Sequence, residues 1–177
     1  WAPVATPFNS SREYKLCKAM CPKTEEEVRE MADVPYRSAI GALMYLAVAT
    51  RPDIAAAVGQ CARYMQNPGR EHWVAVKRIF RYLAGTEDKG LIYNCSVECD
   101  DVETFSDSDW AADQDGRRST TGYIVYLYGC AISWKSKVLN PWAFMAIRAQ
   151  KSGSKRRWKD LPGTTFGERV PWMPWLL

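Results

Sequence analysis

Histidine is nearly absent from this sequence, with His72 alone among 177 residues. Histidine is the usual general base and a frequent metal ligand. Neither a histidine-rich metal site nor a histidine-based catalytic triad can therefore form without this residue. His72 adjoins Trp73 in a helical pattern, and we expect it to pack between helices rather than to act in catalysis.

A long apolar run is also lacking. The longest, residues 39–50, has about twelve residues, whereas a membrane-spanning helix needs roughly 20. We therefore expect a core helix there and no membrane span. No secretory signal pattern is visible, and the first residue is Trp1 rather than methionine, which we interpret as a processed product or an excerpt.

Cysteine is present, but in no common zinc spacing. Two pairs have three residues between their members, and the even total permits disulfides without requiring them in a chain able to bury a core. We expect reduced, structural thiols. The six residues are Cys17, Cys21, Cys61, Cys95, Cys99 and Cys130.

Charge is distributed unevenly. The formal net charge is +4, yet residues 139–177 carry seven Lys and Arg against Asp160 and Glu168, which leaves the rest of the chain nearly neutral. A basic tail can contact nucleic acid or an anionic surface, but we expect this one to be solvated and poorly ordered. Apolar residues make up 47% and the mean hydropathy is −0.35, as in ordinary soluble globular proteins.

The first helical signals follow a lead-in. Residues 1–22 are rich in Pro, Ser and small residues without a sustained period, so we expect an extended, poorly ordered segment. Thr24 is a candidate cap for a short helix at 25–31, in which Glu27 occupies the reciprocal capping position.

A stronger helical pattern begins at Pro35 and continues over residues 36–48. Gly41 weakens this helix by up to about 1 kcal/mol relative to alanine, so we expect it to serve close contact with another helix. One apolar face comprises Ile40, Leu43, Met44 and Ala47.

Two more helices are predicted downstream. Thr50 as a cap and Pro52 in the first turn mark the start of one. The other covers about 71–83 and is stopped by Gly85. Short connections between these helices predict a small antiparallel bundle. The inward residues of the last helix are expected to be Trp73, Val76, Ile79, Phe80 and Leu83.

Short strands are predicted at 90–95 and 102–109, followed by a turn at Asp115-Gly116 and a hairpin of 121–128 and 130–135 around Gly129. Polar residues interrupt the apolar ones, as in a sheet with one solvated face. The fold class is therefore α+β. Its expected parts are a lead-in (1–22), a helical bundle (23–86), a truncated sheet (87–138) and a divergent, Trp- and Pro-rich tail (139–177).

A series of motifs carries a family resemblance. Residues 14–137, roughly 70% of the chain, resemble the end of the reverse transcriptase region and the start of the RNase H domain in Pol polyproteins of copia-type LTR retrotransposons. The motifs include Val34-Pro-Tyr-Arg-Ser-Ala-Ile-Gly-Ala-Leu-Met-Tyr45, Thr50-Arg-Pro-Asp-Ile-Ala55, Lys77-Arg-Ile-Phe-Arg-Tyr-Leu-Ala-Gly-Thr86, Ser106-Asp-Ser-Asp-Trp-Ala111 and Asp115-Gly-Arg-Arg-Ser-Thr-Thr-Gly-Tyr123.

The resemblance implies a thumb- or connection-like bundle followed by a partial RNase H-like sheet. In intact family members that sheet holds two Mg²⁺ ions through several carboxylates. Asp107 matches the first-strand metal aspartate, and Asp109, two residues further on, is a weaker candidate. The segment that supplies the second carboxylate in the family is replaced after Val138, and no acidic residue lies between Asp115 and Asp160. We therefore expect a vestigial catalytic and metal site, no bound cofactor and no enzymatic activity.

Three interpretations of function remain. The first is a non-catalytic Pol fragment, inside the cell, that binds an RNA–DNA hybrid or other nucleic acid weakly through basic residues. The second is a captured fragment that acts as a secreted, RxLR-type effector on a host protein of a plant. The third, minor one is residual RNase H activity. The basic positions expected to contact nucleic acid are Arg51, Arg70, Lys77, Arg78, Arg81, Arg117 and Arg118.

Overall fold

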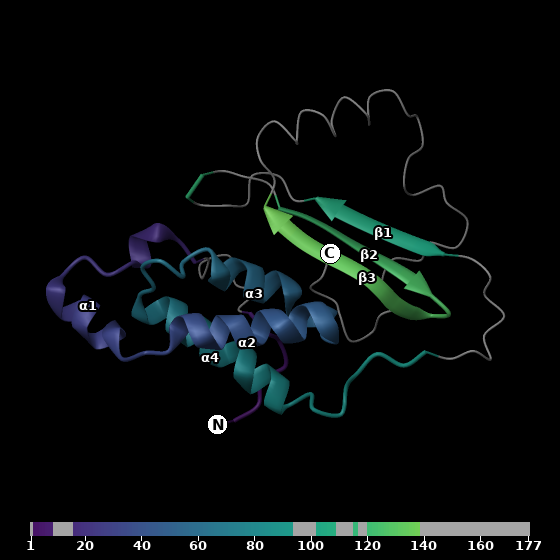
Figure 1. The fold of residues 1–177 in the computed structure, drawn as a ribbon, viewed down its shortest axis with the longest axis horizontal. Helices are drawn as coiled ribbons and strands as arrows, with labels where there is room; N and C mark the ends of the chain where they lie inside the picture. Colours follow the sequence, from purple (N-terminus) through teal and green to yellow (C-terminus); the bar gives the residue numbers. More distant parts are fainter. Residues whose placement is uncertain (1, 9–15, 94–101, 109–114, 117–119, 139–177) are drawn as a thin grey trace.

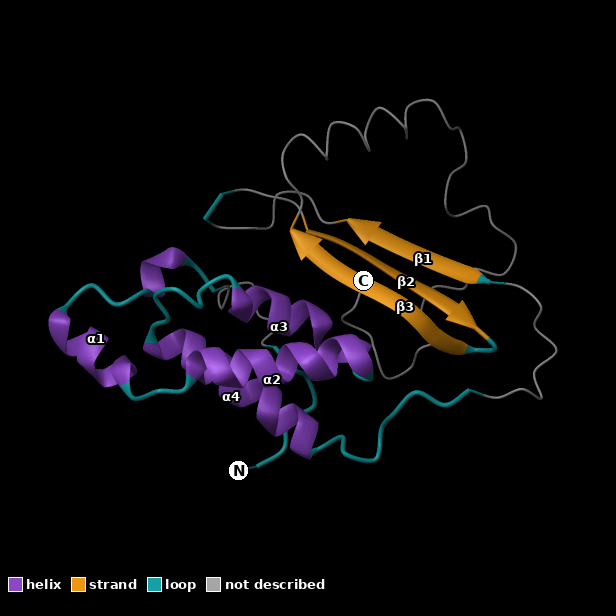
Figure 2. Ribbon diagram, viewed as in Figure 1, coloured by secondary structure: helices purple, strands orange, loops and turns teal. Residues whose placement is uncertain are grey.

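The protein is a mixed α+β molecule in which a group of helices precedes a three-stranded antiparallel sheet (Figures 1 and 2). A computed structural model describes residues 2–8, 16–93, 102–108, 115–116 and 120–138. The tail after Val138, Cys95, Cys99, Asp109, Arg117 and Arg118 lie outside the described residues. No helix in the described part of the chain is long and apolar enough to cross a membrane.

A capping box begins helix α1 (Glu25–Ala32), as the sequence predicts. The side chain of Thr24 accepts a hydrogen bond from the Glu27 amide, and the Glu27 carboxylate accepts one from the Thr24 amide. These bonds satisfy amide groups that have no partner within the helix. Glu27 accordingly has a lowered pKa, because its charged form accepts hydrogen bonds from backbone amides of Lys23 and Thr24.

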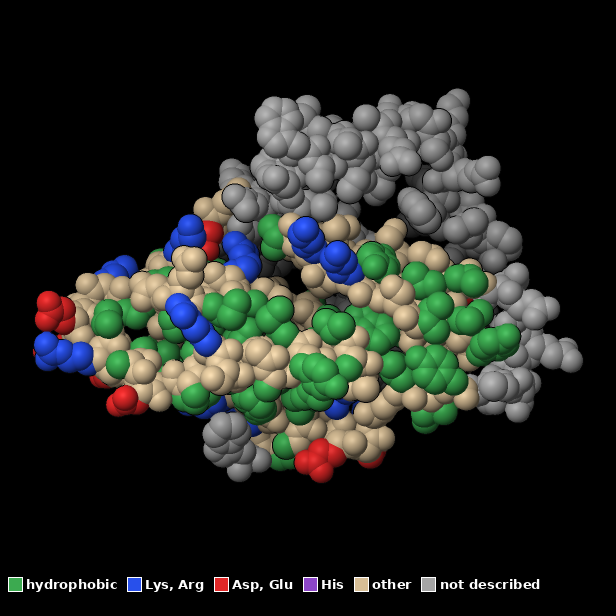
Figure 3. Space-filling view, viewed as in Figure 1, with side chains coloured by type: hydrophobic (Ala, Val, Ile, Leu, Met, Phe, Trp, Pro, Cys, Tyr) green, Lys and Arg blue, Asp and Glu red, His purple; other side chains and the backbone are tan. Residues whose placement is uncertain are grey.

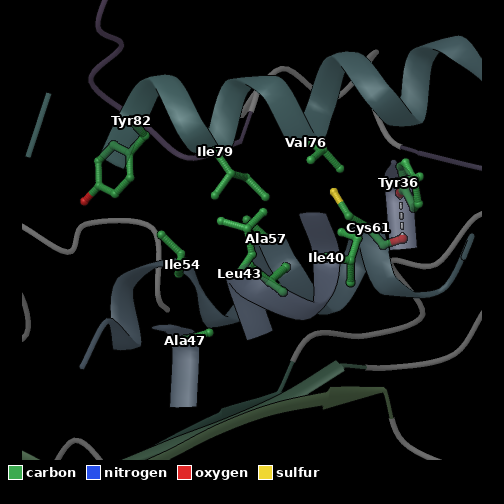
Figure 4. Packing of buried hydrophobic residues seen from close by; sticks show 11 residues of the cluster. Tyr36, Ile40, Leu43, Ala47, Ile54, Ala57, Cys61, Val76, Ile79 and Tyr82 are labelled. Atoms are coloured by element: carbon green, nitrogen blue, oxygen red, sulfur yellow. Dashed lines mark hydrogen bonds between the residues drawn. The ribbon is translucent and has the colours of Figure 1, made fainter. Parts of the chain in front are cut away.

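The core lies between helices α2 (Tyr36–Ala49), α3 (Ala55–Ala62) and α4 (Arg70–Ala84). A short 3-10 helix, η2 (Pro52–Ile54), leads into α3, and another, η1 (Lys18–Met20), precedes α1. Figure 4 shows α4 crossing above the side chains that α2 and α3 direct toward it. The Tyr36 hydroxyl donates to the Cys61 carbonyl at 2.8 Å, so even this buried polar group is satisfied.

Periodicity alone misplaced several residues of these helices. Met44 is 45% exposed rather than buried, and a Cβ added to Gly41 would meet no atom within 4 Å, so Gly41 makes no close helix contact. Thr50 makes no capping bond; it ends α2 instead, and Arg51 precedes η2. In α4 the fully buried positions are His72, Val76, Ile79 and Tyr82, whereas Trp73, Phe80 and Leu83 are only partly buried.

The sheet contains β1 (Glu103–Ser108), β2 (Thr120–Leu127) and β3 (Cys130–Val138) in that order. The predicted hairpin between β2 and β3 is present, and its turn uses positive φ at Tyr128 and at Gly129. The prediction of a strand at 90–95 is wrong for residues 90–93, which are not part of any strand. The predicted turn at Asp115-Gly116 is present.

The sheet rests on the bundle through β3. Elements α3 and η2 contact this strand, and the indole N–H of Trp134 donates to the Ala47 carbonyl at 2.6 Å. Ala47 lies in the last turn of α2, where carbonyl groups lack a partner within the helix. This bond therefore joins the sheet to the bundle and satisfies a helix end.

The lead-in is more ordered than the sequence predicts. Among residues 2–8, Pro7 is fully buried, and Val4 and Phe8 pack against the helical core. The expectation of a poorly ordered segment is wrong here, because apolar side chains too sparse to show a period still find a place on the bundle. The described cysteines, Cys17, Cys21, Cys61 and Cys130, are free thiols.

Candidate functional site

Asp107 lies on β1, opposite Gly122 of β2. A regular strand places residue 109 on the same face as residue 107, but Asp109 falls outside the described residues. Among the described residues, no group of three or more His, Cys, Asp or Glu side chains is arranged to hold a metal ion. A single carboxylate does not confine the two cations that in-line phosphate hydrolysis uses in two-metal sites.

Helix α4 gathers four of the basic residues expected to contact nucleic acid. Arg70 is exposed at its first position, and Lys77, Arg78 and Arg81 are half-buried further along it. Positions 70, 77 and 81 differ by seven and four residues, so they recur on one side of a helix with 3.6 residues per turn. Arg78 follows Lys77 and lies about 100° round the helix from it, at the border of this side. The four residues Arg70, Lys77, Arg78 and Arg81 are called the basic stripe below.

Two arginines of the basic stripe are bonded to the lead-in. Arg78 donates from Nε to the Thr6 carbonyl at 3.2 Å and from Nη2 to the Thr6 hydroxyl at 2.9 Å. Arg81 donates from Nε to the Ala2 carbonyl at 2.7 Å. Among the described residues, no hydrogen bond or ion pair engages the side chains of Arg70 and Lys77. The stripe therefore has a covered half and an open half.

A groove of about 580 Å³ runs beside this contact. The lead-in, α3 and α4 all line it, with Lys77, Arg78 and Arg81 on the α4 side and Pro7 and Phe8 on the lead-in side. A concave surface that combines cations with apolar side chains suits a ligand that carries both phosphates and bases.

Arg51, also expected at the nucleic-acid surface, is buried instead. Its guanidinium donates to both carboxylate oxygens of Asp53, at 2.8 to 3.2 Å, and to the carbonyl and hydroxyl oxygens of Thr86. The Tyr82 hydroxyl donates to Asp53 at 2.8 Å, and burial together with this bond raises the pKa of Tyr82. Arg51 thus connects η2 to the end of α4 and presents no face to a phosphate.

A second polar cluster, around Asp115, was not predicted. Its carboxylate accepts the Lys18 amide at 2.7 Å and the Tyr64 hydroxyl at 2.9 Å, which ties the turn before β2 to η1 and to the residues after α3. The ring of His72 stacks on Tyr64 with 4.1 Å between centroids. Burial lowers the pKa of His72, and its Nδ1 accepts the Gly69 amide, as expected of a packing residue. Only the Asp-Gly turn signal pointed to this cluster.

Exposed apolar side chains form a separate surface over α2 and the neighbouring strands (Figure 3). Tyr45 and Val48 of α2 are 75% and 77% exposed, and Ile132 of β3 is 44% exposed. On the face shown in Figure 3, basic side chains are scattered among apolar and neutral ones rather than gathered in one field.

Several known proteins are similar to this chain. It is 45% identical over 159 residues to the retrovirus-related Pol polyprotein from transposon TNT 1-94 of Nicotiana tabacum, a match that covers 90% of this chain and 12% of that protein. It is 42% identical over 135 residues to the retrovirus-related Pol polyprotein from transposon RE2 of Arabidopsis thaliana, covering 76% of this chain and 9% of that protein. The chain thus spans only a small part of these polyproteins.

A shorter relative is covered more fully. The chain is 49% identical over 107 residues to secreted RxLR effector protein 161 of Plasmopara viticola, a match that covers 60% of this chain and 75% of that protein. No family model matches the chain. No solved structure matches it either.

Proposed function

The chain belongs to the Pol polyprotein family of copia-type retrotransposons, and from this premise we propose that it is a non-catalytic segment of the reverse transcriptase and RNase H region that contacts nucleic acid weakly. The observation that carries the proposal is the basic stripe of α4, in which Arg70 is exposed and the half-buried Lys77 lines a groove. Cations on one side of a helix bind the phosphate backbone without reading its sequence.

Weak binding follows from the bonds of the stripe. Arg78 and Arg81 already donate to oxygens of the lead-in, so two cations rather than four are open to a phosphate backbone. Each neutralised phosphate contributes about 0.9 to the slope of log affinity against log salt concentration for duplex DNA. Two contacts correspond to a shallow salt dependence and to low affinity at physiological salt.

Binding of a fluorescently labelled RNA–DNA hybrid, followed by anisotropy from 50 to 200 mM salt, tests this function. The double substitution Arg70→Gln and Lys77→Gln is expected to remove most of the salt-dependent affinity. The matched control is Lys23→Gln with Lys89→Gln, which removes the same charge from exposed positions outside the stripe. Equal losses in both double variants would show binding to general surface charge and would contradict a site on α4.

The absence of catalysis is part of the proposal. It is supported by the sequence, in which no acidic residue lies between Asp115 and Asp160. We expect no cleavage of an RNA–DNA hybrid with Mg²⁺ added. Turnover by the unmodified protein that disappears in Asp107→Asn would refute this point and would establish residual RNase H activity.

A secreted effector that acts on a host protein is the second candidate, because the chain covers 75% of the Plasmopara viticola effector at 49% identity. The nearest approach to an Arg-x-Leu-Arg motif is Arg81-Tyr-Leu-Ala84, which ends in alanine and lies inside α4, with the Arg81 side chain bonded to Ala2. Fractionation of cells that express the natural gene decides between the candidates. Exclusively intracellular protein would exclude the effector function.

A further inference from the structure

The lead-in holds its place on α4 by packing as well as by hydrogen bonds. Pro7 is fully buried, Val4 and Phe8 contact the core, and Pro3 lies against Gly85 at the end of α4. Residues 2–8 form neither helix nor strand. Their order therefore comes from contacts with the bundle and not from a hydrogen-bonded element of their own.

The bonds to Thr6 have the form of a phosphate contact. Arg78 directs two N–H groups, Nε and Nη2, at two oxygens of one residue, the carbonyl and the hydroxyl of Thr6. Two parallel N–H groups of a guanidinium bind two oxygens of one phosphate in the same way. One turn further along, Arg81 directs Nε at the Ala2 carbonyl. The lead-in thus supplies neutral oxygens to two arginines on successive turns of α4.

We propose that residues 2–8 are a displaceable cover of the basic stripe, and that a nucleic-acid backbone replaces the oxygens of Thr6 and Ala2 on Arg78 and Arg81. This inference rests on the function proposed above and adds its regulation. With the cover in place, Arg70 and Lys77 alone contact phosphates; with the cover released, all four cations do. Proteins or conditions that hold the lead-in elsewhere then raise the affinity for nucleic acid.

Displacement is favoured by charge. A guanidinium bonded to a phosphate gains the attraction between two opposite charges, whereas its present bonds to Thr6 and Ala2 join a cation to oxygens that carry no net charge. The cover is lightly held around Ala2, because Ala2 and Pro3 are exposed and Val4 is half-buried. The groove of about 580 Å³ between the cover and α4 gives a ligand an entrance at the contact itself.

Gly85 offers a way to release the cover without changing any charge. A Cβ at position 85 would lie 2.8 Å from the Cβ of Pro3, so Gly85→Ala forces Pro3 away. The backbone at Gly85 has φ −90 and ψ 0, which lies in the bridge region open to residues other than glycine and not in the left-handed region. Pro3→Gly, added to Gly85→Ala, removes the opposing atom and is expected to let the cover return. The control is Gly41→Ala, where the added Cβ meets no atom within 4 Å.

Two measurements on the full chain test the proposal. Without nucleic acid, the ¹⁵N NMR signals of the Arg78 and Arg81 Nε–H groups report whether the cover is bonded, and we expect Gly85→Ala to shift both. With a labelled DNA duplex, two additional phosphate contacts are expected to steepen the salt slope by about 1.8, which is roughly a twelvefold larger loss of affinity between 50 and 200 mM salt. Pro3→Gly is expected to reverse both effects, and Gly41→Ala to produce neither.

Each other outcome contradicts the cover. Shifted arginine signals with an unchanged salt slope would show that the lead-in leaves without competing for phosphates. Unshifted arginine signals in Gly85→Ala would show that the lead-in is not bonded to Arg78 and Arg81 as described, whatever the salt slope of DNA binding. If Gly85→Ala fails to fold, Thr6→Val removes the hydroxyl acceptor of Arg78 at almost constant volume and is expected to steepen the slope by about 0.9. If even the unmodified protein has no binding that depends on Arg70 and Lys77, the proposed function fails first.

Discussion

The helices and the sheet of this protein are stabilised to different degrees by their own residues. In the helices, Ile40, Leu43, Ile54 and Val76 are completely buried, and they belong to one cluster between α2, η2 and α4. In the described part of the sheet the buried residues are Ile124, Cys130 and Ala131, and Tyr123 and Ile132 are about two-fifths exposed. The helices therefore close a core, whereas the sheet buries a small face.

This difference shows where the stability of the molecule originates. Free energy from apolar burial scales with the area removed from water, so most of it belongs to the bundle. The sheet depends on its contact with α3 and η2 and on the bond from Trp134. Among the described strands, β1 and β3 are the edges, and unpaired edges require protection in a stable protein. Four tests, each made with one or more substitutions, probe this contrast.

The largest effect is expected from Asp53→Ala in the bundle. Asp53 is 1% exposed and neutralises the buried guanidinium of Arg51, so its removal leaves an uncompensated charge. Breaking a buried ion pair in this way typically costs about 3–5 kcal/mol. Urea unfolding followed by far-UV circular dichroism measures the loss.

The exposed pair of Arg29 and Glu25 provides a control for Asp53→Ala. Its side chains are 78% and 91% exposed, and Arg29→Ala is expected to leave the free energy of unfolding almost unchanged. A loss in Asp53→Ala as small as that in Arg29→Ala would mean that water reaches the Arg51 guanidinium. In that case the bundle would be less closed than its burial indicates.

The structure also shows how much of the fold and of the site could be predicted from the sequence. Helical periodicity, the Thr24 cap and the turn at Gly129 predicted α1, α2, α4 and the hairpin, because each depends on residues close in the chain. The burial of Arg51 depends on Thr86, 35 residues away, and the cover of Arg78 depends on Thr6, 72 residues away. No local pattern carries that information. The basic stripe was therefore predictable as a set of residues, and its division into open and covered halves was not.

Paired core substitutions compare the regions directly. Ile79 of α4 is 1% exposed and Ile124 of β2 is 4% exposed. Replacement of a buried isoleucine by alanine costs about 2–5 kcal/mol, and the cost rises with the cavity that remains. We expect Ile79→Ala in the upper half of this range and Ile124→Ala at its lower end, because partly exposed neighbours let the sheet collapse around the gap. Equal losses in chemical denaturation would show that the sheet is packed as tightly as the bundle.

A smaller loss of stability is expected from a substitution at the contact between the sheet and the helical bundle. Trp134→Phe keeps an aromatic ring on β3 but removes the N–H that donates to the Ala47 carbonyl. Loss of such a bond typically costs about 0.5–1.5 kcal/mol. Trp73→Phe is the matched control, since no hydrogen bond of its indole is described. Faster amide exchange in β3, with unchanged exchange in α3, is the expected signature. Unchanged exchange in both would mean that the sheet is held by apolar contacts alone.

The smallest change in the free energy of unfolding should come from Gly41→Ala, which stabilises helix α2 of the bundle and leaves the sheet unaltered. The added Cβ meets no atom within 4 Å, and alanine in the middle of a helix is favoured over glycine by about 0.5–1 kcal/mol. Gly69→Ala is the opposite case, because its Cβ would overlap the Met20 carbonyl, and it should destabilise. If the sheet opens locally, Gly41→Ala slows amide exchange in α2 and leaves that in β2 unchanged, which is the result we expect. Equal slowing in both would mean that the sheet unfolds only together with the bundle. The two regions would then differ in how much apolar surface they bury, but they would unfold as one cooperative unit.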